Sequence, residues 1–414
     1  MADNKDKKVL NVPALRFPEF TEEWERIRVS DLLDFYSTNS LSWEQLEYEQ
    51  NEPYNLHYGL IHVGLPTLID LTKDELPSIK DGNAPKKYEL CKEGDVAFAD
   101  ASEDTNEVAK IVEFYNLDGK KVVCGLHTIH GRNNNKQTAQ GFLGYCFSST
   151  VFHNQIRRIA QGTKIYSIST KNFSEVFVGL PNKKEQQKIA TLLRLIDERI
   201  VTQNKIIEKL ETLIKGIVDF IFNANKFPKV PFKEIYIRAG EGGTPATSIP
   251  EYYNNGTIPF IKIDDLQNKY IRSNKDCITE LGLQKSSAWI VPSNSIIYSN
   301  GATIGAISIN LFPVCTKQGI LGVVPKANIN VEFLYYFMTS TVFTKAVERI
   351  VTEGTMRTAY LKDINHILCP VPCSTQQDEI AKLLSTLSAK LENEITFHRK
   401  LQIQKEFLLS QMFI

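Results

Sequence analysis

The sequence contains no long apolar run. No stretch of its 414 residues approaches the roughly 18 consecutive apolar residues that a membrane-spanning helix requires. The opening segment, MADNKDKKVLNVP, is polar and lacks the apolar core of a signal peptide. An apolar fraction of 42 % is too high for a disordered chain. We therefore expect a folded cytoplasmic protein of two or three domains that makes no contact with a membrane.

Cysteine is also scarce. The seven cysteines are odd in number and form no repeating framework, which favours reduced thiols and a cytoplasmic location. His366, Cys369 and Cys373 are close in sequence, but no second pair of ligands accompanies them. A structural zinc site usually has four ligands. We expect buried thiols here and predict no metal site.

Catalytic motifs are missing as well. The sequence has neither a G-x-x-x-x-G-K-[ST] phosphate loop nor a G-x-G-x-x-G fingerprint, and the glycine-rich segment 240–243 is not followed by residues that could open a dinucleotide-binding helix. Residues 51–54 (NEPY) differ from the Asn-Pro-Pro-Tyr tetrapeptide of adenine methylases at Glu52. His127 and His130 have no paired nucleophile signature. We predict no catalytic residue and no cofactor bound by this chain.

No sign of charge dominates, because 48 Lys and Arg residues balance 48 Asp and Glu residues. Along the chain the balance is uneven: residues 1–182 sum to −6, and residues 227–370 sum to +3. The 56 residues between Asp118 and Glu175 contain eight basic residues and no acidic one. A surface that lies against phosphates excludes carboxylates, so this window favours contact with nucleic acid. An ordinary solvated face is the alternative.

The chain contains an internal duplication. Residues 143–159 (LGYCFSSTVFHNQIRRI) match residues 334–350 (LYYFMTSTVFTKAVERI) at an offset of 191, and residues 179–193 match residues 370–384 at the same offset. The segments between the matches are dissimilar. One scaffold that carries two different inserts indicates two related domains with two specificities.

Each copy ends in a long helix with coiled-coil spacing. Apolar residues recur at alternating intervals of four and three residues, a 3.5-residue period that predicts two helices packed on each other. The expected interface consists of Ile189, Leu193, Ile196, Ile200, Ile207, Leu210, Ile214, Ile380, Leu384, Leu387, Leu391, Leu401 and Leu408. The polar seam residues Gln203, Glu394, His398 and Lys405 either set the register or face solvent. The spacing leaves a parallel and an antiparallel pair both open.

The globular parts have the pattern of mixed α/β structure. Residues 257–263, 295–299, 306–310 and 319–325 are short alternating runs typical of strands, and one short helix is expected at 142–159 and another at 331–350. The polar loop GRNNNKQT (131–138) carries the side chains that read guanine and adenine in the major groove; a plain surface loop is the alternative. GTKIYS (162–167) and GTMRTA (354–359) occur at nearly the same place in the two copies, and we expect both to face DNA; a structural turn is the alternative.

Several of these segments resemble the specificity subunits of type I restriction–modification systems. The resemblance lies in NVPALRFPEFTEEWE (11–25), GDVAFADASEDTNEVAKIVEF (94–114), GLHTIHGR (125–132), GEGGTPATSIPEYYNNGTIPFIKIDDL (240–266), SNGATIGAISIN (299–310) and CTKQGI (315–320), and in the openings of the two long helices, LPNKKEQQKIATLL and VPCSTQQDEIAKLL. It covers nearly the whole chain.

The resemblance implies an α+β chain of two mixed α/β target recognition domains, separated by an antiparallel coiled coil of two long helices and related by a pseudo-twofold repeat. The expected parts are a polar tail (1–12), a first recognition domain (13–181), a first long helix (182–223), a second recognition domain (224–372) and a second long helix (373–414). Each domain would read one half of a bipartite, asymmetric DNA site, and the coiled coil would set the spacer and dock methyltransferase subunits.

The resemblance also implies that the chemistry belongs to partners. These are two methyltransferase subunits that use S-adenosylmethionine and two motor-nuclease subunits that use ATP and Mg²⁺, all acting on double-stranded DNA. A coiled-coil scaffold with two protein-binding ends is the alternative function. The predicted DNA-binding residues are Arg132, Asn133, Asn134, Lys136, Lys164 and Tyr166 in the first domain, and Thr244, Lys262, Asn300, Lys317, Gln318 and Arg357 in the second.

Overall fold

A computed structural model describes residues 10–49, 52–83, 85, 88–224, 227–301, 303–351 and 357–414. The chain divides into two compact units: unit 1 comprises residues 1–203 and 397–414, and unit 2 comprises residues 204–396. None of the helices in the described ranges is both long enough and apolar enough to cross a membrane. Most of the predicted tail (1–12) and residues 354–356 of the GTMRTA segment lie outside the described residues.

Unit 1 is built on a five-stranded mixed sheet in the order β2-β11-β7-β9-β5. Its strands are β2 (Asp34–Tyr36), β11 (Thr128–Arg132), β7 (Val96–Ala99), β9 (Ile111–Asn116) and β5 (Leu68–Asp70). A four-stranded sheet in the order β10-β4-β6-β3 consists of β10 (Val122–Cys124), β4 (Tyr54–Leu56), β6 (Ser78–Ile79) and β3 (Leu46–Glu47). Unit 1 also contains two antiparallel two-stranded sheets. One pairs β1 (Glu25–Arg28) with β13 (Phe177–Leu180), and the other pairs β8 (Ala101–Ser102) with β12 (Tyr166–Ser167). The helices of unit 1 that precede its long helix are α1 (Val29–Leu32), α2 (Tyr58–Val63), α3 (Phe142–Phe147), α4 (Thr150–Ile159) and α5 (Thr170–Ser174).

Unit 2 has the same kind of architecture. A five-stranded sheet runs β15 (Tyr236–Glu241), β22 (Ile320–Pro325), β19 (Ile296–Ser299), β20 (Ile307–Asn310) and β17 (Tyr270–Ile271). A three-stranded sheet runs β18 (Cys277–Ile278), β16 (Ile258–Ile261) and β21 (Cys315–Thr316), and β14 (Lys229–Pro231) pairs with β23 (Leu368–Pro370). Its short helices are α7 (Glu280–Gln284), α8 (Val331–Thr339), α9 (Thr341–Glu348) and α10 (Leu361–Ile364). The four strands predicted from alternation correspond to β16, β19, β20 and β22.

The single helix predicted before each long helix is in fact two helices. The break falls at a serine in both copies: the side chain of Ser149 caps α4 by accepting from the N–H of Phe152, and Ser340 caps α9 by accepting from the N–H of Phe343. Both phenylalanines are buried. Because serine is a strong N-cap residue and a poor residue inside a helix, the chain ends one helix and begins another there.

Each copy has a buried glutamine at the same relative position, and this side chain links the start of the long helix to the segment before the short helices. Gln186 accepts from the backbone N–H of Ala139 (2.7 Å) and donates to the carbonyl oxygens of Pro181 and Gln137. Gln377, 191 residues later, makes the equivalent bonds to Asn330, Pro372 and Asn328. In each copy these bonds satisfy one backbone group just before the long helix and two in the segment before the short helices, so the same side chain ties the same two segments together in both copies.

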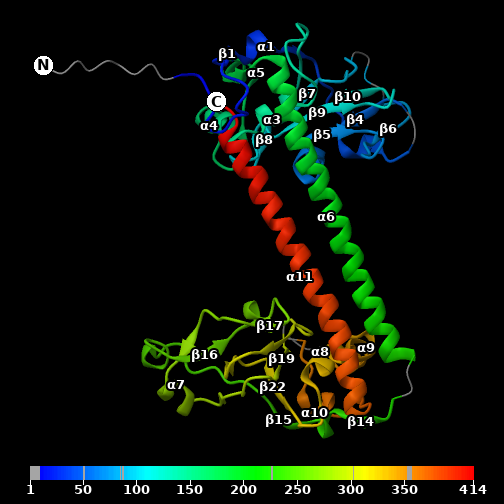
Figure 1. Cartoon of the computed structure of the whole chain (residues 1–414), viewed down its shortest axis with the longest axis vertical. Helices are drawn as coiled ribbons and strands as arrows, with labels where there is room; N and C mark the ends of the chain where they lie inside the picture. The colour runs from blue at the N-terminus through cyan, green and yellow to red at the C-terminus, as the bar shows by residue number, and fades with distance from the viewer. Residues whose placement is uncertain are drawn as a thin grey trace, which may run out of the picture. The chain divides into compact units, whose positions relative to one another are not determined.

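The long helices are α6 (Lys183–Ala224) and α11 (Ser374–Gln411), each of which contributes residues to both units. In unit 1 the start of α6 packs beside the end of α11, as Figure 1 shows, where Ile189 and Leu193 share a core with Leu408 and Met412. The Nζ of Lys405 lies 2.6 Å from Oδ1 of Asp197 in the same pair of segments. Residues early in α6 thus meet residues late in α11, so the two helices run antiparallel in unit 1.

Unit 2 contains the complementary pairing. Val218, Ile221 and Phe222, near the end of α6, share a core with Ala381 and Leu384, near the start of α11. The predicted seam residues of both helices are buried or half-buried: Ile189, Leu193, Ile196, Leu384, Leu401 and Leu408 are buried, and Ile200, Ile207, Leu210, Ile214, Ile380, Leu387 and Leu391 are half-buried. The antiparallel pairing of the two long helices within each unit and the internal repeat are confirmed.

Candidate nucleic-acid interface

The polar loop 131–138 begins with the last two residues of β11, which lies next to the edge strand β2 in the five-stranded sheet of unit 1. Its turn is made at Lys136, whose φ of 51° lies in the left-handed region, and the Nδ2 of Asn133 donates to Oγ1 of Thr138 across the loop (2.9 Å). The Nδ2 of Asn134 donates to the hydroxyl of Tyr36 (2.9 Å) and to the carboxylate of Asp34. Asn134 and Lys136 are exposed, so the loop presents an amide and a cation to solvent.

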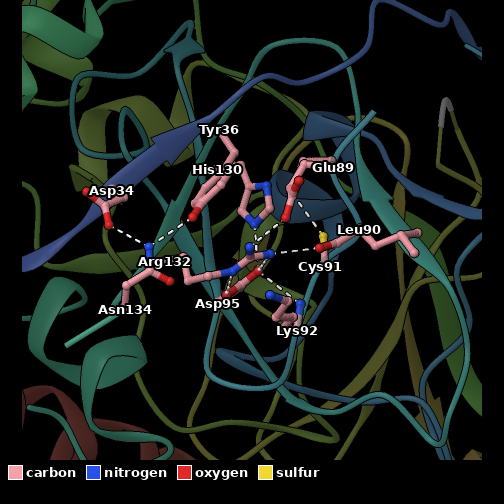
Figure 2. Close-up of polar contacts among 11 residues, drawn as sticks. Asp34, Tyr36, Glu89, Leu90, Cys91, Lys92, Asp95, His130, Arg132 and Asn134 are labelled. Carbon is pink, nitrogen blue, oxygen red and sulfur yellow. Dashed lines mark hydrogen bonds and ion pairs between the residues drawn. The ribbon is translucent and has the colours of Figure 1, made fainter. Parts of the chain in front are cut away.

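Arg132 lies beneath this loop rather than on its surface. Its side chain is 7 % exposed, and all three guanidinium nitrogens donate: Nε and Nη2 to the two oxygens of Asp95 (2.9 and 2.8 Å), Nη1 to Glu89, and Nη2 also to the carbonyl oxygen of Leu90. The guanidinium also lies 4.3 Å from the ring centroid of Tyr36. Figure 2 shows these contacts converging on Arg132 and Asp95.

The charges in this network stabilise one another. Burial disfavours the charged guanidinium, but the hydrogen bonds that it donates to Asp95 and Glu89 outweigh the effect of burial and raise the pKa of Arg132. Burial likewise opposes ionisation of Asp95, yet His130 and Arg132 hold the pKa of its carboxyl below the ordinary value. Such an engaged guanidinium supports the loop, whereas a base-reading arginine needs a free pair of donors. Base reading by Arg132 stays a prediction, and the geometry favours a supporting role.

A cleft of about 580 Å³ opens beside the loop. Three exposed lysines, Lys92, Lys136 and Lys183, line it together with the polar side chains of Asn133 and Asn134. Glu113 also lines it, and burial raises the pKa of that carboxyl to about 7 although the backbone N–H groups of Gly144 and Gly141 oppose the shift. Among the exposed charged residues of the lining, three lysines outnumber one carboxylate, Glu93, and this excess of cations fits a phosphate-facing surface.

Lys164 and Tyr166 lie at a different place in unit 1. Tyr166 begins β12 and pairs with Ser102 of β8, and the intervening Ile165 lines a second cleft of about 580 Å³. That cleft shares no lining residue with the first and contains Glu103, Asp104 and Glu107 against a single lysine, Lys110. The structure therefore does not bring Lys164 and Tyr166 together with the loop at 131–138. The acidic lining of the second cleft would also repel phosphates.

Four of the six predicted residues of unit 2 come together. The backbone N–H of Gln318 donates to Oγ1 of Thr244 (3.3 Å), and the backbone N–H of Lys317 donates to the carbonyl oxygen of Ile261, the neighbour of Lys262. Lys317 and Gln318 are exposed. Lys262 is half-buried and lies 2.9 Å from the carboxylate of Asp276.

The glycine-rich segment before Thr244 has a packing role. A Cβ added to Gly242 would lie 1.8 Å from the carbonyl oxygen of Thr316, and one added to Gly243 would lie 2.3 Å from Oγ of Ser287. Only glycine lets the backbone approach this closely. The motif therefore places Thr244 beside the turn at Lys317 and Gln318 and has no phosphate-loop geometry.

Asn300 is fully buried and connects three segments of unit 2. Its Nδ2 donates to Oε1 of Glu241 (2.7 Å) and to the carbonyl oxygen of Ala359 (3.1 Å), and its backbone N–H donates to Gly319. Arg357, two residues before Ala359, is exposed and lines a cleft of about 370 Å³. Asn300 thus holds the segment that carries Arg357 and does not itself face solvent.

One exposed cation near this group was missed in the sequence. Arg238 on β15 stacks its guanidinium on the ring of Trp289 at 4.1 Å, and the Nε1 of Trp289 donates to the carbonyl oxygen of Glu241. Arg238 therefore flanks the segment that leads to Thr244. A lone arginine in a short strand gives no sequence signal, since only the fold brings it to Trp289.

The fold has a counterpart of known structure. The S subunit of a type I restriction–modification system from M. genitalium superposes with a TM-score of 0.59 over 97 % of this chain and 99 % of that one, at 18 % identity. The fold is therefore that of a specificity subunit: two mixed α/β units and a pair of long helices.

The family is shown by the sequence. The family described as type I restriction modification DNA specificity domain matches residues 114–212 and 229–404, more than half of the chain, and the chain belongs to this family. The MjaVIII specificity subunit of Methanocaldococcus jannaschii is 23 % identical over 433 residues, covering 97 % of this chain and 93 % of the relative. The MjaIX specificity subunit of the same organism is 31 % identical over 156 residues, a match that spans 37 % of this chain and 36 % of the relative.

Proposed function

We propose that the chain is the DNA-recognition subunit of a type I restriction–modification complex and that each unit reads one half of a bipartite, asymmetric site. The observation that carries the proposal is the duplicated frame. The family match covers a region in each copy. Within each copy, a serine and a glutamine at equivalent positions make the same structural contacts, while the exposed loops of the two copies differ.

Within each unit we assign different roles to buried and exposed residues. Arg132 and Asn300 are buried and support their segments, whereas Lys136, Lys317, Gln318 and Arg357 are exposed and available to DNA. Asn134 is exposed as well, but its Nδ2 already donates to Asp34 and Tyr36. Phosphate contacts position a protein on the duplex, and base contacts specify the sequence. The lysines would supply the first kind of contact, and Gln318 together with Arg357 would supply the second.

The chemistry would reside in partners. Two methyltransferase subunits would use S-adenosylmethionine on adenines that are flipped out of the duplex, and two motor-nuclease subunits would use ATP and Mg²⁺, all in the cytoplasm. This chain would contribute recognition and no catalytic group. The recognition parts would span residues 13–181 and 224–372, and the coiled coil between them would set the unread spacer.

The test is a genome-wide map of methylated adenine in cells with and without the gene. Loss of one bipartite motif on deletion, with all other methylation unchanged, is the expected result. Deletion that removes no bipartite motif would contradict the proposal. If the assembled complex showed no salt-dependent affinity for DNA, a scaffold that binds proteins would be favoured instead, because affinity that depends on phosphate contacts falls as the salt concentration rises.

A further inference from the structure

Three ligand-type side chains meet in the interior of unit 1. Cys91, Cys124 and His130 are buried, and one potential ligand atom from each lies within 4.8 Å of the other two. They come from three segments: the stretch before β7, the end of β10, and β11. The backbone fixes their approach, since the N–H of Cys91 donates to the carbonyl oxygen of Val122 (2.8 Å) and Leu90 bridges to Val123.

The spacing of the two sulfurs fits a shared metal ion. The Sγ atoms of Cys91 and Cys124 lie 3.6 Å apart and both thiols are free. Two thiolates bound to one tetrahedral zinc ion at about 2.3 Å have their sulfurs roughly 3.7 Å apart. The pair is therefore already at the separation that such an ion imposes.

His130 is oriented as a metal ligand. Its Nε2 lies 2.7 Å from Oδ2 of Asp95, and Asp95 is fixed in turn by Arg132 and by the backbone N–H of Lys92 (2.9 Å). Figure 2 shows the ring held from this side. A carboxylate on one ring nitrogen keeps the proton there and leaves the other nitrogen as a donor of its lone pair. That other nitrogen, Nδ1, is buried without a hydrogen-bond partner among the described residues.

An unpartnered polar atom in a buried site is costly, and so are buried thiolates. A bound cation would satisfy Nδ1 and neutralise both thiolates together, releasing their protons. Asp95 and Arg132, which fix His130, also line the cleft beside the loop at 131–138.

We propose that Cys91, Cys124 and Nδ1 of His130 bind one thiophilic d¹⁰ metal ion, Zn²⁺ or Cu⁺. The ligand set of two thiolates and one imidazole is soft and excludes Ca²⁺ and Mg²⁺. The ion would tie β10, β11 and the segment before β7 together beneath the loop at 131–138. Its presence would not depend on whether unit 1 binds DNA. The sequence gives no signal for this set, because its members, at 91, 124 and 130, follow none of the short spacings of zinc motifs.

The experiment uses the full chain under reducing conditions, stripped with a chelator and then titrated separately with Zn²⁺, Cu⁺ and Co²⁺. We expect one equivalent of Zn²⁺ or Cu⁺ per chain, a thiolate-to-cobalt charge-transfer band in the Co²⁺ arm, and a metal-dependent rise in Tm. Binding of Zn²⁺ or of Cu⁺ identifies the ion, and either supports the site.

Variants locate the binding. Cys91→Ser and Cys124→Ala should each lower the metal affinity by at least tenfold, the lower bound for loss of even an outer-shell partner. Cys373→Ser, at an exposed thiol outside the cluster, should bind as the parent chain does. The proposal is overturned if the stripped parent chain takes up none of the three ions, or if Cys91→Ser and Cys124→Ala bind as tightly as Cys373→Ser. If a cluster variant fails to fold, absence of metal uptake by the parent chain still overturns the proposal.

Discussion

Arg132 and Asp95 form a two-pronged ion pair in the interior of unit 1, with Nε and Nη2 of the guanidinium 2.9 and 2.8 Å from the two carboxylate oxygens. The pair joins the end of β11 to the start of β7, directly beneath the loop that carries Asn134 and Lys136. Because both charges are buried, each depends on the other for its stability.

Replacing Arg132 with Ala should therefore destabilise unit 1. Removal of one partner from a buried pair leaves the other charge uncompensated and costs about 3–5 kcal/mol in the free energy of unfolding. Thermal or urea unfolding of the variant measures this, with Lys136→Ala in the exposed loop as the control. An unchanged unfolding transition, together with lost preference for one base of the DNA site, would instead assign Arg132 to base reading.

Arg357 should behave in the opposite way. It is exposed on the segment that Asn300 holds, so Arg357→Ala should leave unfolding unchanged and weaken DNA binding of the assembled complex by about 1–3 kcal/mol. Lys362→Ala removes one positive charge from the exposed surface of nearby α10 and serves as the matched control. A change in affinity below about twofold, far under that range, would rule Arg357 out as a base-reading residue.

The stability of unit 1 should fall as the pH rises from about 4.5 to about 7. Burial raises the pKa of Glu113 from 4.5 to about 7, so between these values the folded state holds a proton that the unfolded state has lost. This contribution is fully present below the unfolded pKa and is lost as the pH passes through the folded one; its size is on the order of 3 kcal/mol. Unfolding of the parent chain and of Glu113→Gln, compared across this range, isolates the effect. Equal pH slopes for the two proteins would contradict it.

Lengthening both long helices by one heptad should change the spacer of the DNA site and leave both half-sites intact. Duplicating residues 201–207 in α6 and 392–398 in α11 preserves the 3.5-residue seam, so the helices can still pack. Mapping of methylated adenines in cells that express the variant gives the new motif. An unchanged spacer would mean that the coiled coil does not act as a ruler.

The repeat and the seam could be predicted from the sequence because both depend on local periodicity. Ile189, Leu193 and Leu408 are buried as the spacing indicates. The spacing of the apolar residues does not determine whether the helix pair is parallel or antiparallel, because that depends on which helix ends meet in the folded chain. Lys405 and Asp197 meet in unit 1, a contact between residues more than 200 positions apart.

Exposure could not be predicted for the candidate site. The sequence does not distinguish an arginine or asparagine that faces DNA from one that faces the interior. Arg132 is buried because Asp95, just before the neighbouring strand β7, binds its guanidinium. Asn300 is buried for a similar reason, since Glu241 and Ala359 close over it. The separation of Lys164 and Tyr166 from the loop at 131–138 likewise follows from strand pairing between β8 and β12.

The most direct test of the central claim, that each unit reads one half-site, is an exchange of residues 224–372 for the corresponding segment of another specificity subunit, followed by a map of methylated adenines. The account predicts that one half of the bipartite motif changes to the half read by the donor, while the other half and the spacer stay the same. A motif in which both halves change, or in which neither does, would contradict it.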